Sequence, residues 1–331
     1  MAIRIQRREF IATIGGAAAA WPLATRAQQP VMPVIGFLSS VSPEAYARRL
    51  RAFHQALKET GYVEGQNVEV EYRWAEGQNN RLPALAAELV HRQVAVIAAA
   101  GSSSALAAKA ETTTVPIVFS AAVDPVAVGL VASLNRPGGN LTGVTSLNVE
   151  VGPKRLELLH EVVPSATSMA LLVNPTNPSI AEPFSRALQA AARALGLQLH
   201  VLHAGSEREI EAAFATLVKL RAGGLVIMPD QFFLARNEQL AALTVRHAVP
   251  SVHLFREFAA AGGLMSYGSD EREYYRLVGI YIGRILAGEK PSDLPVQQVT
   301  KVELIINLKT ARALGLTIPL PLLARADEVI E

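Results

Sequence analysis

Short apolar runs alternate with longer amphipathic segments along most of the chain. The runs that predict strands lie at residues 34–38, 68–74, 94–100, 116–122, 169–173, 197–202, 223–228 and 250–255. Segments with helical spacing lie between them, at 45–60, 82–91, 154–162, 183–195, 207–220 and 237–247. Strands that alternate with helices are typical of parallel sheets covered by helices on both faces. The pattern therefore predicts an α/β fold.

The predicted helix at 45–60 shows how this pattern arises. Leu50, Phe53, Ala56 and Leu57 recur at helical spacing and form one apolar face, and Gly61 follows at the expected end.

The alternation occurs twice, which predicts two lobes of similar order. A turn cluster at 135–140 and a strand-like run at 141–146 separate the two sets. A further strand at 263–268, a helix at 271–287, and another strand with a helix start at 296–308 follow the second set. We expect the first lobe to contain residues 31–147 and 267–292, and the second to contain 148–266 and 293–331. Each lobe is then discontinuous, with several strands crossing a hinge.

The first 27 residues have the composition of a signal peptide. Arg4, Arg7 and Arg8 precede a mildly apolar run at 11–23, and Thr25 and Ala27 supply small residues for cleavage after Ala27. The segment at 7–11 resembles a twin-arginine motif, while an ordinary secretory signal with two adjacent arginines is the alternative. Either route predicts export to the periplasm.

Charge and cysteine content exclude several classes of function. The leader holds four arginines and one glutamate, which leaves 27 basic and 28 acidic residues in the rest of the chain. A near-neutral body without a basic stripe argues against nucleic acid as a partner. The absence of cysteine excludes disulfides and thiolate chemistry. No window of about 20 apolar residues follows the leader, so we expect no span in the mature chain.

Polar residues gather directly after the predicted strands. In open parallel sheets, ligands bind at the carboxyl ends of the strands. The candidates of the first half are Ser39, Ser40, Gly101, Ser102, Ser103, Ser104, Ser120 and Asp124, and those of the second are Asn174, Asn177, Asp230, Phe232, Phe233 and Arg256.

The Gly101 loop suits an anion. Glycine lets the backbone turn closely, and three serines follow it at the start of a predicted helix, where free N–H groups favour a carboxylate. A plain helix cap is the alternative, since serine is a common capping residue.

Asp124 and Asp230 are candidates for pairing with a solute ammonium group, because a carboxylate in a closing cleft is costly unless it is paired. Turn formation before Pro125 is the alternative for Asp124. Phe232, Phe233 and Tyr267 offer rings for stacking on a solute, with ordinary packing as the alternative.

Enzyme motifs are missing from the sequence. Neither a G-x-G-x-x-G turn, nor a P-loop, nor a G-x-S-x-G elbow, nor H-E-x-x-H spacing occurs. We therefore expect no catalytic residues, cofactor or metal. An exported α/β enzyme acting on a small molecule, and a ligand-sensing module for a membrane sensor, remain the alternatives to a transport receptor.

Several segments resemble the ABC-transporter substrate-binding family related to tryptophan and tyrosine receptors. They are the leader at 7–11 with its Ala-Trp-Pro-Leu stretch, residues 33–38, the Gly101 loop, Val-Asp-Pro at 123–125, Asn174-Pro175 and Ser-Tyr-Gly at 266–268. The most specific is Arg-Pro-Gly-Gly-Asn-Leu-Thr-Gly at 136–143.

The resemblance implies a type I periplasmic binding protein fold, in which two Rossmann-like lobes are joined by three crossovers and close on a solute. It further implies a monomer that works with a permease and an ATPase of an ABC importer. The solute contacts that it implies are the loop at 102–104, Asp124, Asn174, Asp230 and Tyr267. An amino acid or a related carboxylate is the favoured solute.

Overall fold

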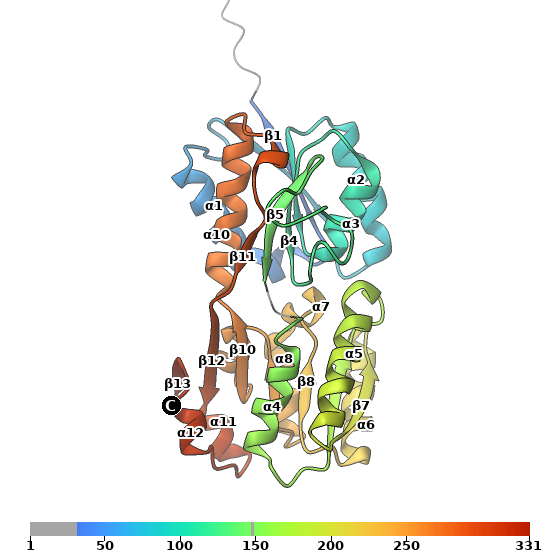
Figure 1. The fold of residues 1–331 in the computed structure, drawn as a ribbon, viewed down its shortest axis with the longest axis vertical. Helices are drawn as coiled ribbons and strands as arrows, with labels where there is room; N and C mark the ends of the chain where they lie inside the picture. Colours follow the sequence, from blue (N-terminus) through green and yellow to red (C-terminus); the bar gives the residue numbers. More distant parts are fainter. Residues whose placement is uncertain (1–31, 147–148) are drawn as a thin grey trace, which may run out of the picture. The chain divides into compact units, whose positions relative to one another are not determined.

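The computed structural model of the protein describes residues 32–146 and 149–331. Two sheets with flanking helices form the two lobes (Figure 1). The predicted signal peptide at 1–27 lies outside the described residues. Within them, every helix falls short of the length and apolar character that a membrane crossing requires.

The sheet of the first lobe is six-stranded and parallel, with the order β11-β5-β4-β3-β1-β2. Its strands are β1 (Val34–Ser39), β2 (Glu69–Trp74), β3 (Val96–Ala100), β4 (Ile117–Ala121), β5 (Leu141–Ser146) and β11 (Gln297–Val299). The order reverses at β1, where β2 lies on one side and β3 on the other. A reversal of this kind opens a crevice at the carboxyl ends of the strands.

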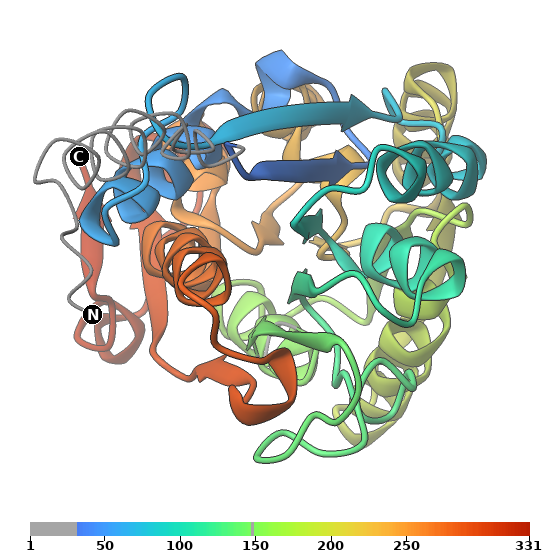
Figure 2. The ribbon, with the colours of Figure 1, turned by 90° about the horizontal axis from the view of Figure 1, so that it is seen from above.

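Helices cover both faces of this sheet (Figure 2). They are α1 (Pro43–Glu59), α2 (Leu82–His91), α3 (Ser102–Glu111) and α10 (Glu271–Leu286), with short 3₁₀ turns η1 (Asn79–Arg81) and η2 (Pro291–Asp293). α1 packs on α10, and α2 packs on α3.

The α1–α10 contact is unusually close. A methyl group on Gly279 would lie only 2.7 Å from the carbonyl oxygen of Phe53, so only glycine fits there. Phe53 itself is almost fully buried, as the apolar face of the predicted helix requires. This packing holds α10, which follows the strand β10 of the second lobe in sequence, against α1 of the first lobe.

The sheet of the second lobe is seven-stranded, with the order β13-β12-β10-β9-β8-β6-β7. Only the β10–β12 pair is antiparallel. Its strands are β6 (Ser168–Val173), β7 (Gln198–His203), β8 (Leu225–Ile227), β9 (Ser251–His253), β10 (Met265–Ser269), β12 (Val302–Asn307) and β13 (Glu328–Ile330). Its helices are α4 (Gly152–Val162), α5 (Pro178–Ala194), α6 (Glu207–Leu220), α7 (Gln231–Leu234), α8 (Asn237–Arg246), α9 (Arg256–Ala260), α11 (Leu308–Ala313) and α12 (Leu320–Leu323).

The predicted two-lobed α/β fold is confirmed, and strand pairing refines the expected lobe boundaries. The chain passes between the sheets after Ser146, after Ser269 and after Val299. β10 pairs along its whole length with the second sheet, so that lobe extends to Ser269 rather than 266. β11 pairs with β5, so the first lobe extends to Val299 rather than 292.

Two predicted elements differ most from the structure. The run at 296–308, predicted as one strand and a helix start, divides into β11 and β12, which belong to different sheets. The helix predicted at 183–195 is α5, which begins at Pro178 because Asn177-Pro178 supplies an earlier start and Pro183 is accommodated inside the helix.

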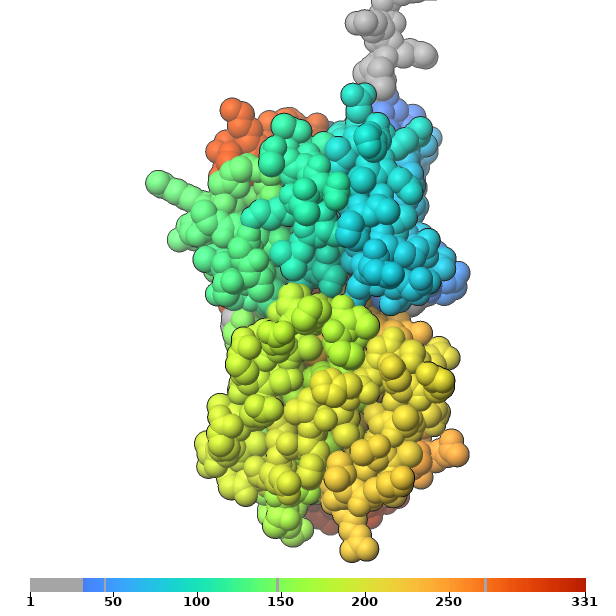
Figure 3. All heavy atoms as spheres, turned by 90° about the vertical axis from the view of Figure 1, so that its right-hand side faces the viewer, coloured from blue at the N-terminus to red at the C-terminus, as the bar shows by residue number. Residues whose placement is uncertain are grey.

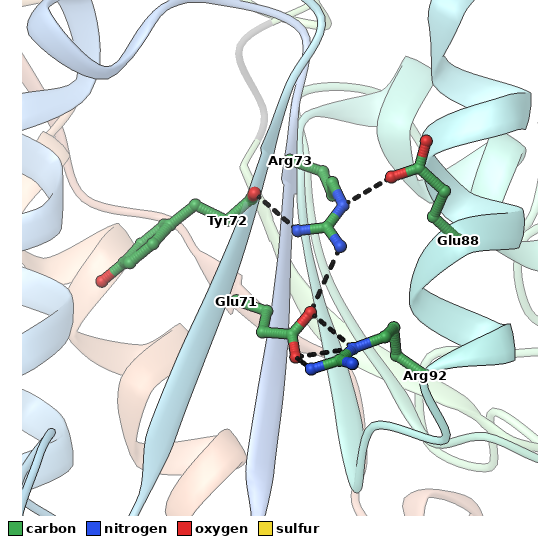
Figure 4. A network of polar contacts seen from close by, with 5 residues as sticks. All are labelled: Glu71, Tyr72, Arg73, Glu88 and Arg92. Carbon is green, nitrogen blue, oxygen red and sulfur yellow. Dashed lines mark hydrogen bonds and ion pairs between the residues drawn. The ribbon is translucent and has the colours of Figure 1, made fainter.

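Charged side chains protect the exposed edge strand β2 (Figure 4). Arg73 Nε donates to Glu88 Oε2 at 2.8 Å, and Arg92 Nη2 donates to Glu71 Oε1 at 2.5 Å. Arg73 also contacts Glu71 at 3.2 Å and donates to the Tyr72 carbonyl oxygen at 3.0 Å. The hydrogen bond from Arg92 lowers the pKa of Glu71. Charges along an edge oppose pairing with a strand of another molecule.

Candidate functional site

A cleft lies between the lobes, at the carboxyl ends of strands from both sheets. Its cavity volume in this structure is about 30 Å³, smaller than that of typical small-molecule sites. Its lining from the first lobe is Ser40, Gly101, Ser102, Ser103, Ser120, Ala122, Ser146, Tyr274 and Tyr275. The second lobe contributes Asn177, Ile180, Pro229, Gln231, Leu234, Leu254 and Phe255.

The first lobe presents the start of α3 to this cleft. Gly101 has φ 97° and ψ 157°, a conformation that is essentially restricted to glycine, and its N–H donates to Ser120 Oγ at 3.0 Å. No side chain caps α3, and the hydroxyls of Ser102 and Ser104 are buried without a hydrogen-bond partner among the described residues. The first N–H groups of a helix have no partner inside the helix. The start of α3 can therefore bind an anionic group such as a carboxylate.

The second lobe presents a network centred on Asp230. Asn174 Nδ2 donates to Asp230 Oδ1 at 2.8 Å, and Asn177 Nδ2 donates to Asp230 Oδ2 at 2.8 Å. The Phe232 N–H donates to Asp230 Oδ1 at 3.0 Å, so Asp230 caps α7. Burial raises the pKa of Asp230, while these hydrogen bonds oppose the rise. Asn177 is the residue of this network that lines the cleft.

Three other predicted residues make contacts outside the cleft lining. Asp124 Oδ1 accepts from the Val126 N–H at 2.8 Å in an exposed turn. Phe232 is buried beneath Arg236, whose guanidinium carbon lies 3.9 Å from the ring centre. The Tyr267 carbonyl oxygen accepts from Arg155 Nε at 2.7 Å.

Arg155 lies in α4 and is fully buried beside the hinge strand β10. Burial lowers the pKa of Arg155 to about 9. Its bond to Tyr267 ties the first helix of the second lobe to a strand that ends at a crossing between the lobes.

The predicted site residues thus divide into two groups. The structure brings Ser40, Gly101, Ser102, Ser103, Ser120 and Asn177 together in the cleft lining. Ser39, Ser104, Asp124, Asn174, Asp230, Phe232, Phe233, Arg256 and Tyr267 lie outside that lining. A direct solute contact for the second group stays a prediction.

The sequence interpretation missed part of the lining. Gln231 follows Asp230 directly, and Leu254 and Phe255 follow β9, so position after a strand was a signal for all three. Tyr274 and Tyr275 belong to α10, which returns to the first lobe after the second is built. Their place in the cleft depends on that return and had no local signal.

Direct contacts join the lobes beside the cleft. Arg49 Nη1 donates to Gln231 Oε1 at 3.1 Å, and Arg48 Nη1 contacts Glu257 Oε1 at 2.5 Å. Asn79 Nδ2 donates to the Thr176 carbonyl oxygen at 3.1 Å. α3 also contacts α5, on the face drawn in Figure 3. The described structure is therefore a closed arrangement of the two lobes.

Metal ligation has no support in the described part of the chain. Across residues 32–146 and 149–331, no three His, Asp or Glu side chains are placed to hold a metal ion. The arrangement offers hydroxyls, amides and helix N–H groups, which suit the reversible binding of an organic solute.

Comparison with known proteins identifies this arrangement. The family described as "ABC transporter substrate binding protein" matches residues 34–330. The chain belongs to this family. Its members are binding proteins rather than enzymes, in agreement with the expectation from the missing enzyme motifs.

Individual relatives of this ABC transporter substrate-binding protein cover most of its length. The "Tyrosine-binding protein" of Clostridioides difficile (strain R20291) is 25% identical over 283 residues, which are 85% of this chain and 81% of the relative. A "conserved domain protein" from Vibrio cholerae has a crystal structure with a TM-score of 0.81 and 27% identity, covering 90% of this chain and 99% of that one. An "ABC domain in complex with L-Trp" from Streptococcus pneumoniae has a TM-score of 0.80 and 24% identity, with the same coverage.

Proposed function

We propose that this substrate-binding protein captures a neutral amino acid with an apolar side chain in the cleft between its lobes. The observation that carries the proposal is the uncapped start of α3, where buried Ser102 faces the cleft without a hydrogen-bond partner among the described residues. A solute carboxylate would accept hydrogen bonds from these groups.

The rest of the lining favours a zwitterion with an apolar side chain. Among the described residues that line the cleft, none carries a formal charge. Ile180, Leu234, Leu254 and Phe255 give the second lobe an apolar wall. A side chain with a net charge would lose its water there without gaining an opposite charge, which is costly.

The relatives support the same solute class. One is named for tyrosine binding, and the solved structure of another contains L-Trp. In this chain, Tyr274, Tyr275 and Phe255 supply rings that can contact an aromatic side chain.

The solute ammonium group has two candidate partners. Asp230 is the predicted one, and its oxygens are already bonded to Asn174, Asn177 and the Phe232 N–H. We propose that Asp230 acts through Asn177, which lines the cleft, and that the negative charge behind this amide favours an ammonium group. Asp124 would act at the margin of the cleft, and Tyr267 would act at the hinge.

We further propose that the protein is exported to the periplasm, works as a monomer and delivers its solute to the permease and ATPase subunits of an importer. The family assignment and the signal-like composition of residues 1–27 support this proposal.

A calorimetric titration of the full-length chain with single amino acids tests the solute assignment. Tyrosine, tryptophan, phenylalanine and leucine represent the expected class, while lysine, glutamate and glucose are the controls. We expect saturable binding and a raised melting temperature with members of the first group only, because a ligand that binds only the folded state stabilises it. Binding of glucose alone, or of lysine and glutamate in preference to the first group, would overturn the assignment.

A further inference from the structure

Gln231 lines the cleft, and its side chain reaches across the cleft from the second lobe to the first. It belongs to the second lobe at the start of α7, and it lies beside Gly101 and Tyr275 of the first lobe in the cleft lining. Asp230 fixes the start of α7 by capping it, and Asn174 and Asn177 hold Asp230 in turn. These hydrogen bonds fix the start of α7, so the second lobe positions the Gln231 side chain.

Three groups of the first lobe receive this side chain. Gln231 Oε1 accepts from Arg49 Nη1 at 3.1 Å, and Gln231 Nε2 donates to the Tyr275 hydroxyl at 3.5 Å. Gly101 leaves room for it, since a methyl group at Gly101 would lie 3.3 Å from Gln231 Cγ. We call these contacts to Arg49, Tyr275 and Gly101 the Gln231 latch.

Arg49 makes the latch depend on whether the two lobes are open or closed. Its side chain is buried, with the guanidinium carbon 5.1 Å from the Tyr46 ring centre and 5.7 Å from that of Tyr275. A buried cation gains from each acceptor that it meets, and a hydrogen bond to a charged group contributes more than a neutral one. Opening of the lobes would remove the Gln231 acceptor from Arg49.

We propose that Gln231 is the positioning residue that couples solute contact to lobe closure. A solute that contacts the Gln231 amide, or the Tyr275 ring beside it, orders the same side chain that holds Arg49. The solute then favours the closed state by differential contact. The coupling to solute rests on the proposed function, whereas the effect of the latch on closure does not.

The test measures the distance between the lobes with and without solute. The chain has no cysteine, so Ala110→Cys in α3 and Ala194→Cys in α5, both exposed, give a unique pair of spin labels in the full-length protein. Pulsed electron resonance then gives the ratio of open to closed molecules. Gln231→Ala removes the latch, and Gln231→Glu strengthens it by pairing a carboxylate with Arg49. Circular dichroism confirms that each variant is folded.

Asn79→Ala is the matched control, because it removes an exposed hydrogen bond between the lobes that lies away from the cleft lining. Without solute, we expect the open-to-closed ratio to rise about tenfold in Gln231→Ala, to fall in Gln231→Glu, and to change by less than about threefold in Asn79→Ala. Distances in both Gln231 variants that match those of Asn79→Ala would overturn the proposal.

Titration with tyrosine or leucine separates this inference from the proposed function. If the order Gln231→Glu, wild type, Gln231→Ala holds without solute and no amino acid binds, the latch stands and the solute assignment fails. If an amino acid closes the wild type and both Gln231 variants with equal affinity, the solute assignment stands and the coupling is refuted.

Discussion

The helices α3 and α7 start at corresponding places in the two lobes, yet their first turns have opposite chemistry. Both follow a strand and both face the cleft. Gly101 precedes α3 and offers no side chain, while Asp230 precedes α7 and caps it. The start of α3 therefore offers N–H groups and the Ser102 hydroxyl to the cleft, whereas Asp230 satisfies the start of α7 and bonds to Asn174 and Asn177.

This difference shows how one fold can supply a rigid side and a receptive side to a single site. Asn174, Asn177 and Asp230 are bonded to one another, so the second lobe positions Gln231 and its apolar wall without help from a solute. In the proposed function, Ser102 and the start of α3 gain their missing partners from the bound solute. Two of the four predictions below test this contrast within the rims, one concerns a buried histidine of the second lobe, and the last compares the rims with the surface.

The largest effect is expected from Asp230→Ala. The substitution leaves two buried amides without an acceptor and removes the cap of α7. We expect a loss of about 2–4 kcal/mol in the free energy of unfolding, measured by urea denaturation. Solute affinity should fall as well, because α7 carries Gln231. Asp230→Asn is the control that preserves shape, and a loss below about 0.5 kcal/mol for Asp230→Ala would contradict the structural role.

A pH dependence is expected from His253, which is buried in the second lobe beside Asn237 and the Met228 carbonyl oxygen. Burial lowers the pKa of His253 from 6.5 to about 3. Its stabilising contribution is fully present above pH 6.5 and is lost as the pH falls toward 3, because only the unfolded chain takes up the proton in this window.

The contribution of His253 at pH 5 is roughly 2 kcal/mol less than at pH 7. Urea denaturation of the wild type and of His253→Gln at several pH values measures it, since the difference between the two curves removes the effect of other titrating groups. Parallel curves between pH 7 and 5 would show that His253 is protonated equally in both states.

A smaller effect on binding is expected from Ser102→Ala, with Ser104→Ala as its matched partner. Both hydroxyls are buried without a hydrogen-bond partner among the described residues, but only Ser102 lines the cleft. We expect Ser102→Ala to weaken solute binding by about 0.5–1.5 kcal/mol, and Ser104→Ala to leave it unchanged. Equal effects in calorimetry would mean that the Ser102 hydroxyl makes no direct contact with the solute.

The smallest effect is expected from Arg92→Gln, in the charged network on β2 (Figure 4). The Arg92 side chain is 63% exposed, so water and salt screen its pair with Glu71. We expect a loss of about 0.2–1 kcal/mol in the free energy of unfolding and no change in solute affinity. A change in affinity would indicate that the outer edge of the first lobe is coupled to the cleft.

Patterns within short segments predicted most of the elements. The helices at 82–91 and 207–220 have the same bounds in the sequence interpretation and in the structure. Apolar spacing and end signals are local properties, so they can be seen in sequence. The division of residues 296–308 into β11 and β12 could not be, because a short apolar run does not reveal which sheet will pair with it.

The sequence alone determined the α/β class, the two lobes and the polar rim at the carboxyl ends of the strands. Each of these depends on the order of apolar and polar residues along the chain. Only the tertiary structure decided which rim residues face a solute. Asp230 reads in sequence as a free carboxylate after a strand, but Asn174 and Asn177, more than 50 positions away, occupy both of its oxygens. Gln231 and Tyr275 meet in the cleft because the chain returns to the first lobe through α10, a contact that no local pattern encodes.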